Sequence, residues 1–242
     1  LYYQRILTQI CRWPEYRSSQ KIWSITVLCG RFLYSHKIIS MRSWLTNIQW
    51  CPGCWDFLII MAIKNAFKEL GIPSHKRVIV SWVGCSGKSS QYIDGYAAET
   101  LHGRAVPFAT GVKLADPDMI VVIVGGDGDG YGIGMWHFIH ACRRNLDMTY
   151  IVFNNENYAL TTGQASATTP IGAVTKTTPE GNMIAPINPV ALATEAGCKF
   201  SKRAHSQKFA ELKEIIKAAI QHQWFSHIDV EQDCPSFRRW AS

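Results

Sequence analysis

Two uninterrupted apolar runs, at residues 119–124 and 150–153, stand out in the pattern of hydrophobic and polar positions along the chain. Continuous apolar runs of this length are typical of parallel strands that are buried on both faces. Between them, apolar residues recur at helical spacing at Met135, Phe138 and Cys142. The pattern predicts a strand, a crossover helix and a parallel strand, joined in a right-handed unit.

The same hydrophobic pattern predicts elements on either side of this unit. Helices are expected at residues 57–70, 95–101, 108–114, 131–144, 188–196 and 209–221, and further strands at 77–83, 198–200 and 227–231. Residues 161–183 are rich in Thr, Gly and Pro and are expected to form a long loop, which in a compact domain is more often functional than idle. The predicted fold class is α/β, a parallel sheet flanked by helices.

A polar turn follows each of the two apolar runs. Gly126-Asp127-Gly128 comes after the first, and Asn154-Asn155 after the second. Ligands of open α/β sheets bind outside the carboxyl ends of the strands, and glycines let a diphosphate approach the backbone. Carboxylate and amide oxygens suit Mg²⁺ that also holds phosphate oxygens. The two turns therefore predict a magnesium–diphosphate site.

The glycine-rich turn has two other interpretations. A dinucleotide fingerprint, G-x-G-x-x-G, is excluded because Tyr131 and Ile133 stand where the third glycine would be needed. A tight connection without a ligand is the remaining alternative for a lone GDG. The second turn favours the ligand site, because GDG followed by NN is similar to the signature of thiamine diphosphate enzymes.

Cysteines provide a second signal, since four of the eight lie in distinctive settings. Cys51 and Cys54 form a Cys-x-x-Cys pair, Cys85 follows a predicted strand, and Cys234 lies near the end of the sequence. Four thiolates suit zinc or an iron–sulfur cluster equally well by spacing, whereas nothing marks the chain as secreted and rich in disulfides. A cluster beside a thiamine site can accept electrons, which zinc cannot, so a cluster is favoured.

With these two polar turns and these cysteines, the chain resembles the β subunits of 2-oxoacid:ferredoxin oxidoreductases, most of all the 2-oxoglutarate (KorB-type) branch, over roughly residues 44–240. The motifs that carry the resemblance are WCPGC, VGCSGKS, LHGRAVPFATGVKLADPD, GGDGDGYGIG, HFIHACRRN, NNENYALTTGQ, TPEGN and CPSF. The chain departs from the family at Trp55, where the family usually has glycine.

The resemblance implies a set of site residues. The Mg²⁺ of thiamine diphosphate would be held by the side chains of Asp127 and Asn155 and the main-chain carbonyl of Asn157. The same cofactor site would include Gly126, Gly128, Asp129 and Tyr158. A [4Fe-4S] cluster would be bound by Cys51, Cys54, Cys85 and Cys234. Lys88, His102 and Leu160 would lie at the active site.

The resemblance also implies a reaction. The family uses thiamine diphosphate to decarboxylate a 2-oxoacid oxidatively, here 2-oxoglutarate to succinyl-CoA, and passes electrons through the cluster to ferredoxin, with coenzyme A as co-substrate. The glutamate that activates the cofactor belongs to a partner α subunit, so we expect a heterodimer that is active only when assembled, and a cytoplasmic location. Pyruvate or another 2-oxoacid as substrate, and a zinc-stabilised binding module without redox chemistry, remain alternatives.

Single residues have simpler interpretations too. A phosphate-binding P-loop that contains Lys88 is excluded, because Trp82 stands where that motif needs glycine. Lys88 could also be an ordinary solvated lysine on a loop. His102 could cap or pack as readily as function. His137 and His140 are expected to pack or face solvent rather than bind metal.

The formal net charge of +7 is concentrated at the N-terminus. Residues 1–42 hold seven Lys or Arg against Glu15 alone, which leaves 18 of the 25 basic and 17 of the 18 acidic residues for the rest. We therefore expect no nucleic-acid binding by the main domain, residues 43–242. Lys21, Arg31 and Lys37 interrupt every apolar run before it could span a bilayer. Residues 1–42 are expected to lie outside the conserved fold, with a basic targeting segment as the alternative.

Overall fold

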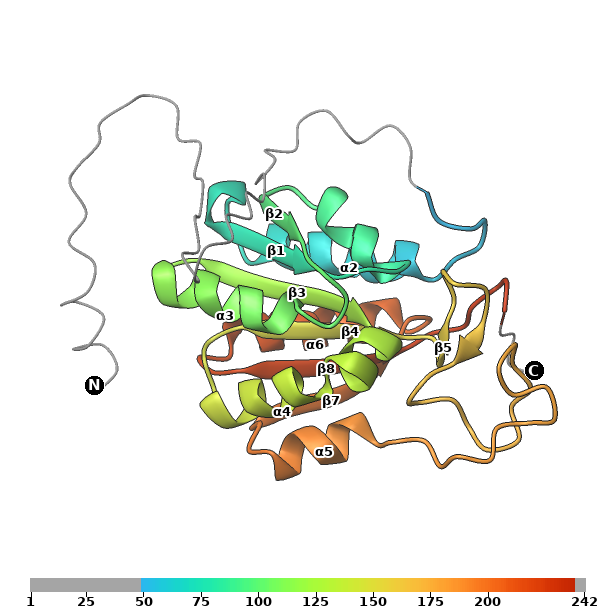
Figure 1. The fold of residues 1–242 in the computed structure, drawn as a ribbon. Helices are drawn as coiled ribbons and strands as arrows, with labels where there is room; N and C mark the ends of the chain where they lie inside the picture. The colour runs from blue at the N-terminus through green and yellow to red at the C-terminus, as the bar shows by residue number, and fades with distance from the viewer. Residues whose placement is uncertain (1–48, 238–242) are drawn as a thin grey trace, which may run out of the picture. The chain divides into compact units, whose positions relative to one another are not determined.

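A six-stranded parallel sheet organises the computed structural model, which describes residues 49–237. The strands lie in the order β2-β1-β3-β4-β8-β7 (Figure 1). Their bounds are Tyr96–Glu99 (β2), Arg77–Ser81 (β1), Ile120–Gly126 (β3), Thr149–Asn154 (β4), Ser226–Glu231 (β8) and Phe200–His205 (β7). The predicted α/β fold with a parallel sheet is confirmed. The expected extension, residues 1–42, lies outside the described residues.

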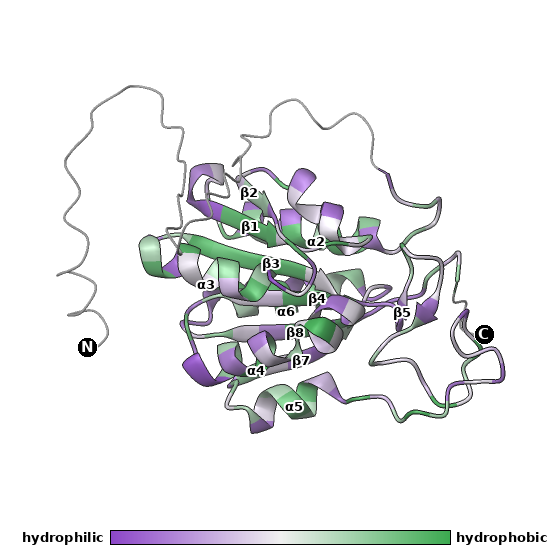
Figure 2. Ribbon diagram, in the orientation of Figure 1, coloured by the Kyte–Doolittle hydropathy of each residue, from purple (hydrophilic) through white to green (hydrophobic). Residues whose placement is uncertain are grey.

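Helices pack on both faces of this sheet. On one face lie α2 (Asp56–Glu69) and α6 (Phe209–Gln221); on the other lie α3 (Ala105–Ala115), α4 (Met135–Arg144) and α5 (Pro189–Glu195). Along β3, Val122 and Val124 face the first pair, while Val121 and Ile123 face the second group. Hydrophobic residues accordingly colour β1, β3 and β4 along their length (Figure 2). Burial on both faces explains why the central residues of these strands are apolar.

The β3–α4–β4 unit places two chain turns at the same edge of the sheet. β3 and β4 pair in parallel, with Gly126 opposite Phe153, so both strands end at neighbouring points. A turn of π-helix, η3 (Gly128–Ile133), follows β3, and α4 begins only at Met135. The helix predicted from residue 131 therefore starts later, because the glycine-rich turn forms its own element.

One predicted helix is wrong. Residues 95–101 contain the edge strand β2, which pairs in parallel with β1. Its alanines favour a helix in isolation, but strand pairing overrides that preference. Gly95 has φ +148°, and a side chain there would meet the backbone of Arg77. Two short 3₁₀ turns, η1 (Ser74–Lys76) and η2 (Ser86–Gln91), flank β1.

The segment after β4 is largely irregular, as predicted for residues 161–183. It contains a small antiparallel pair, β5 (Asn157–Tyr158) and β6 (Gln164–Ala165), at the carboxyl edge of the main sheet. The strand predicted at 198–200 begins at Phe200 instead. No helix among residues 49–237 is both long and apolar enough to cross a bilayer.

Candidate functional site

The turn after β3 brings the backbone close to a tyrosine ring. Tyr158 Oη donates a hydrogen bond to the carbonyl of Gly128 over 3.0 Å. A Cβ atom at Gly128 would overlap the Tyr158 ring, so only glycine permits this approach. The glycine-rich turn after β3 is thus in direct contact with the segment that follows β4.

The turn after β4 is held by its own asparagines. The backbone N–H of Asn157 donates to Asn155 Oδ1 over 3.2 Å, and Asn157 Nδ2 donates to the Asn155 carbonyl over 2.8 Å. Between them, Glu156 adopts a left-handed conformation with φ +57°. This local bonding is an asparagine turn, which explains why the sequence has polar amides directly after an apolar strand.

Asp127 is the central carboxylate of the two turns. Its side chain is 1% exposed, and burial raises its pKa to about 6. Hydrogen bonds from Ser166, from Thr168 and from the backbone at Asn155 partly offset that rise in pKa. Thr168 Oγ1 lies 3.0 Å from Asp127 Oδ2. The backbone of Asn155 therefore contacts Asp127, and the two turns are neighbours.

A cavity of ≈ 210 Å³ opens over these turns. It is lined by every predicted cofactor-site residue, namely Gly126, Asp127, Gly128, Asp129, Asn155, Asn157 and Tyr158. His102 and Leu160 also line it, and His102 Nδ1 pairs with the buried carboxylate of Asp129. Asn157 Oδ1 is buried without a hydrogen-bond partner. Carboxylate and amide oxygens beside glycines fit a Mg²⁺–diphosphate group.

A second cavity, of ≈ 270 Å³, is lined by all four predicted cluster cysteines. The Cys51–Cys54 turn is closed by a bond from the Cys54 N–H to the Cys51 carbonyl over 3.0 Å, and Trp50 Nε1 donates to the Cys85 carbonyl over 2.7 Å. Burial raises the pKa of the Cys85 thiol to about 12 and that of Cys54 further. Within residues 49–237, no three Cys, His, Asp or Glu side chains are grouped to hold a single metal ion.

The two cavities adjoin. Their shared lining residues are Cys85, Asn155, Ala159, Leu160 and Gln232. Lys88 lines the cysteine cavity rather than the diphosphate cavity, and its Nζ donates to the carbonyl of Gln49 over 2.9 Å. Of the three predicted active-site residues, the structure thus brings His102 and Leu160 to the diphosphate turns and Lys88 to the cysteines.

Several residues of this region are not predicted by any motif in the sequence. Gln232 Nε2 donates to the buried carboxylate of Asp56 over 2.7 Å, and both line the cysteine cavity. Asp56 follows Cys54 by two residues and Gln232 precedes Cys234 by two, so proximity to the cysteines was the available signal. Thr168 had no signal, because it contacts Asp127 only through the folding of a long loop.

Two histidines and Trp55 can be placed as well. His137 Nε2 lies 3.0 Å from Arg104 Nη1 on the exposed side of α4, and His140 is half-buried on the same helix. Trp55 caps α2 with φ −74°, an ordinary right-handed conformation that needs no glycine. The departure from the family at Trp55 therefore does not strain the backbone.

Comparison with known proteins assigns the class of this fold and site. A family model described as the C-terminal TPP-binding domain of thiamine pyrophosphate enzymes matches residues 75–230. The 2-oxoacid:ferredoxin oxidoreductase subunit beta of Saccharolobus solfataricus is 49% identical over 191 residues, which cover 78% of this chain and 63% of that protein. The 2-oxoglutarate synthase subunit KorB of Archaeoglobus fulgidus is 44% identical over 199 residues, covering 82% of this chain and 74% of that protein.

A solved structure is similar too. It is a 2-oxoglutarate:ferredoxin oxidoreductase from Magnetococcus marinus with 2-oxoglutarate, coenzyme A and succinyl-CoA bound. The TM-score is 0.79 at 37% identity, covering 84% of this chain and 72% of that one. The chain belongs to the thiamine pyrophosphate enzymes, in the family of 2-oxoacid:ferredoxin oxidoreductase β subunits. It spans less than two thirds of the length of the Saccharolobus relative.

Proposed function

We propose that this chain is the β subunit of an enzyme that converts 2-oxoglutarate and coenzyme A to succinyl-CoA and carbon dioxide. It would act with thiamine diphosphate, Mg²⁺ and a [4Fe-4S] cluster, and deliver electrons to ferredoxin. A partner α subunit would complete the active site. The family membership supports the type of reaction, and the names of KorB relatives and the ligands of the Magnetococcus marinus structure support the substrate.

The observation that carries this proposal is the common wall of the two cavities. Cys85 and Asn155 line both, so a cysteine expected to bind the cluster stands beside an amide expected to bind the cofactor's metal. Leu160, which is 50% exposed, also borders both cavities. Electron transfer after decarboxylation requires a short separation between the cofactor and the cluster. A zinc-stabilised binding module has no electron transfer and would not require that separation.

This chain's residues would bind and orient the cofactor. Thiamine diphosphate supplies carbanion stabilisation, the difficult part of decarboxylation. Asp127 and Asn155 would hold the cation, with the carbonyl of Asn157 as a further oxygen ligand. The glycine backbone would admit the diphosphate. His102, fixed against Asp129, would present its other ring nitrogen to the cavity. The cysteine thiolates would hold the cluster.

Substrate choice is proposed to involve Lys88. The described residues that line the diphosphate cavity include no lysine or arginine. Lys88 lies in the adjoining cavity, and its ammonium group would pair with the second carboxylate of a dicarboxylate substrate. Pyruvate has a single carboxylate and would gain less from this pairing. The charge would also offset that of the cluster thiolates.

The test is anaerobic turnover by the full chain assembled with its partner subunit. Ferredoxin reduction should require coenzyme A and proceed with a higher kcat/KM for 2-oxoglutarate than for pyruvate. Lys88→Met should raise the KM for 2-oxoglutarate more than that for pyruvate, while Lys68→Met, on an exposed position of α2, should change neither. A preference for pyruvate would overturn the substrate, and no turnover with any 2-oxoacid would overturn the proposed reaction.

A further inference from the structure

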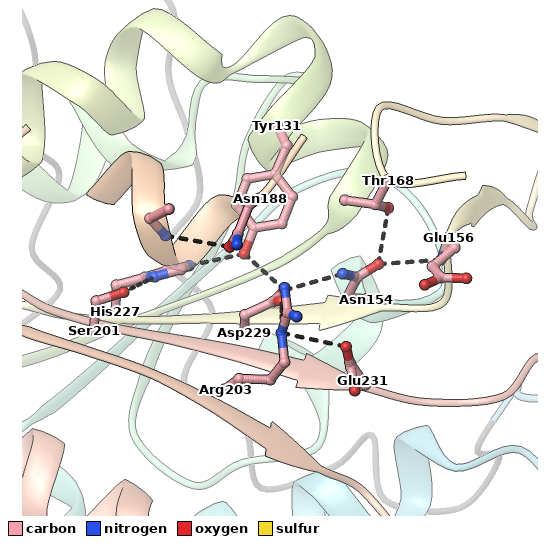
Figure 3. A network of polar contacts seen from close by, with 11 residues as sticks. Tyr131, Asn154, Glu156, Thr168, Asn188, Ser201, Arg203, His227, Asp229 and Glu231 are labelled. Carbon is pink, nitrogen blue, oxygen red and sulfur yellow. Dashed lines mark hydrogen bonds and ion pairs between the residues drawn. The ribbon is translucent and has the colours of Figure 1, made fainter. Parts of the chain in front are cut away.

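A buried carboxylate outside both cavities, that of Asp229, accepts hydrogen bonds from the two segments that form the proposed cofactor site. Asp229 lies on β8, and its side chain is 0% exposed. It lines neither cavity. Its carboxylate nevertheless accepts hydrogen bonds from both turns at the carboxyl edge of the sheet, as Figure 3 shows.

The first bond reaches the turn after β3. Tyr131, in η3 and four residues beyond Asp127, donates from its Oη to Asp229 Oδ1 over 3.0 Å. The same hydroxyl lies 2.8 Å from His227 Nε2, whose Nδ1 lies 2.9 Å from Ser201 Oγ. The Tyr131 ring packs against the rings of Phe138 and His227, with centroids 5.7 and 5.9 Å away. This contact fixes the far end of the glycine-rich turn against β8.

The second bond reaches the last residue of β4, at which the polar turn begins. Asn154, directly before Asn155, donates from Nδ2 to the same Asp229 Oδ1 over 3.1 Å. The Asn154 Oδ1 atom lies 2.9 Å from Thr168 Oγ1, which in turn lies 3.0 Å from Asp127 Oδ2. One oxygen of Asp229 is therefore connected to the side chain of Asp127 through two intermediate residues.

The other carboxylate oxygen of Asp229 faces a cation. Arg203 Nε, on the adjacent strand β7, lies 3.2 Å from Asp229 Oδ2 and 3.2 Å from Glu231 Oε1. The guanidinium thus stands between two carboxylates in Figure 3. A buried carboxylate is expensive unless it is paired and hydrogen-bonded, and Asp229 has both kinds of partner. Burial raises the pKa of Asp229, and the ion pair with Arg203 and the hydrogen bonds from Tyr131 and Asn154 oppose that rise.

We propose that Asp229 is a positioning residue that sets the separation between the Asp127 turn and the Asn155 turn, and so fits the cation site to Mg²⁺. This inference rests on the proposed function of those turns as the cofactor's metal site. Mg²⁺ demands nearly octahedral oxygen ligands at 2.0–2.1 Å, whereas Ca²⁺ accepts 2.3–2.6 Å and irregular geometry. Loosening the spacing must therefore weaken Mg²⁺ binding more than Ca²⁺ binding.

The experiment is calorimetric titration of thiamine diphosphate into the full chain assembled with its partner subunit, with either Mg²⁺ or Ca²⁺. In Asp229→Asn, an amide N–H₂ group replaces one of the two carboxylate oxygens. The oxygen that is lost is either the one that faces Arg203 in the wild type or the one that accepts from Tyr131 and Asn154. The affinity with Mg²⁺ should fall by about 10–100-fold, the range for groups that orient metal ligands. The affinity with Ca²⁺ should fall several-fold less.

Two further variants keep the test decisive. Tyr131→Phe removes one hydroxyl while leaving the ring in place, and should shift the Mg²⁺ to Ca²⁺ affinity ratio in the same direction; added to Asp229→Asn, it should cause little further loss. Ser201→Ala removes a bond to His227 without touching Asp229, and should leave the ratio at the wild-type value.

The outcomes separate this inference from the proposed function. Equal losses for the two cations, or wild-type affinities in both Asp229→Asn and Tyr131→Phe, would overturn the positioning role even with the metal site intact. Absence of cation-dependent binding in the wild-type assembly would instead overturn the proposed site itself. If Asp229→Asn fails to fold, Tyr131→Phe alone decides the question.

Discussion

Replacing Asp127 by asparagine should stabilise the cofactor-free protein while abolishing its magnesium-dependent affinity for thiamine diphosphate. Asp127 is almost completely buried, and burial raises its pKa from the ordinary value of 3.8 to about 6. A raised pKa means that the folded state prefers the protonated carboxyl, so the charged form costs stability. Asparagine has the same shape and carries no charge.

The magnitude follows from this shift in pKa. A rise of about two units corresponds to about 3 kcal/mol, which is fully felt at pH values above about 6 and disappears as the pH falls through 6 toward 3.8. Part of the gain is lost because the new amide N–H₂ faces donors, among them Thr168 Oγ1, and one mismatched hydrogen bond costs about 1 kcal/mol. We therefore expect Asp127→Asn to be about 1–2 kcal/mol more stable than wild type at pH 8.

The assay is urea unfolding of both proteins with a chelator present, at pH 8 and pH 4, followed by titration with thiamine diphosphate and Mg²⁺. The stability advantage should be present at pH 8 and absent at pH 4. A variant that is less stable than wild type at pH 8, or that still binds thiamine diphosphate in a magnesium-dependent way, would refute the argument.

Three more perturbations test separate parts of the structure. Cys234→Ala should abolish the iron content and visible colour of the anaerobically purified assembly; a brown variant with full iron would show that Cys234 is not a ligand. Gly128→Ala should weaken thiamine diphosphate binding by about tenfold, because the methyl group must displace the Tyr158 ring; unchanged affinity in a titration would contradict the close approach. His227→Gln should flatten the dependence of unfolding free energy on pH. Burial lowers the pKa of His227 from 6.5 to about 3, so wild-type stability should fall by about 1.4 kcal/mol per unit as the pH drops below 6.5, and equal slopes in the two proteins would count against that assignment.

Local signals in the sequence were sufficient to predict that the turns after β3 and β4 are neighbours. Each turn directly follows a strand that is apolar because it is buried on both faces, and parallel pairing of β3 with β4 brings their ends together. Asp127, Asn155 and Tyr158 therefore line one cavity, and their role in binding a cofactor stays a prediction. The four cysteines line one cavity for a similar reason, since each lies in a turn or loop close to the carboxyl edge.

Tertiary contacts account for what the sequence could not predict. The alanines of β2 suggested a helix, but pairing with β1 decides their conformation. Asp229 carries no motif, and it acquires significance only because Tyr131, 98 residues away, and Asn154 both donate to it. Lys88 follows a cysteine of the predicted cluster, and the structure places it on that side rather than over the diphosphate turns.

The most direct test of the central claim is the cofactor content of the chain purified anaerobically with its partner subunit. Iron, acid-labile sulfide, zinc and thiamine diphosphate would be quantified together with the visible spectrum. We predict brown protein with about four irons and four sulfides per chain, the content of one [4Fe-4S] cluster, and bound thiamine diphosphate. Colourless protein that contains zinc or no metal would contradict the proposed electron path and with it the oxidoreductase function.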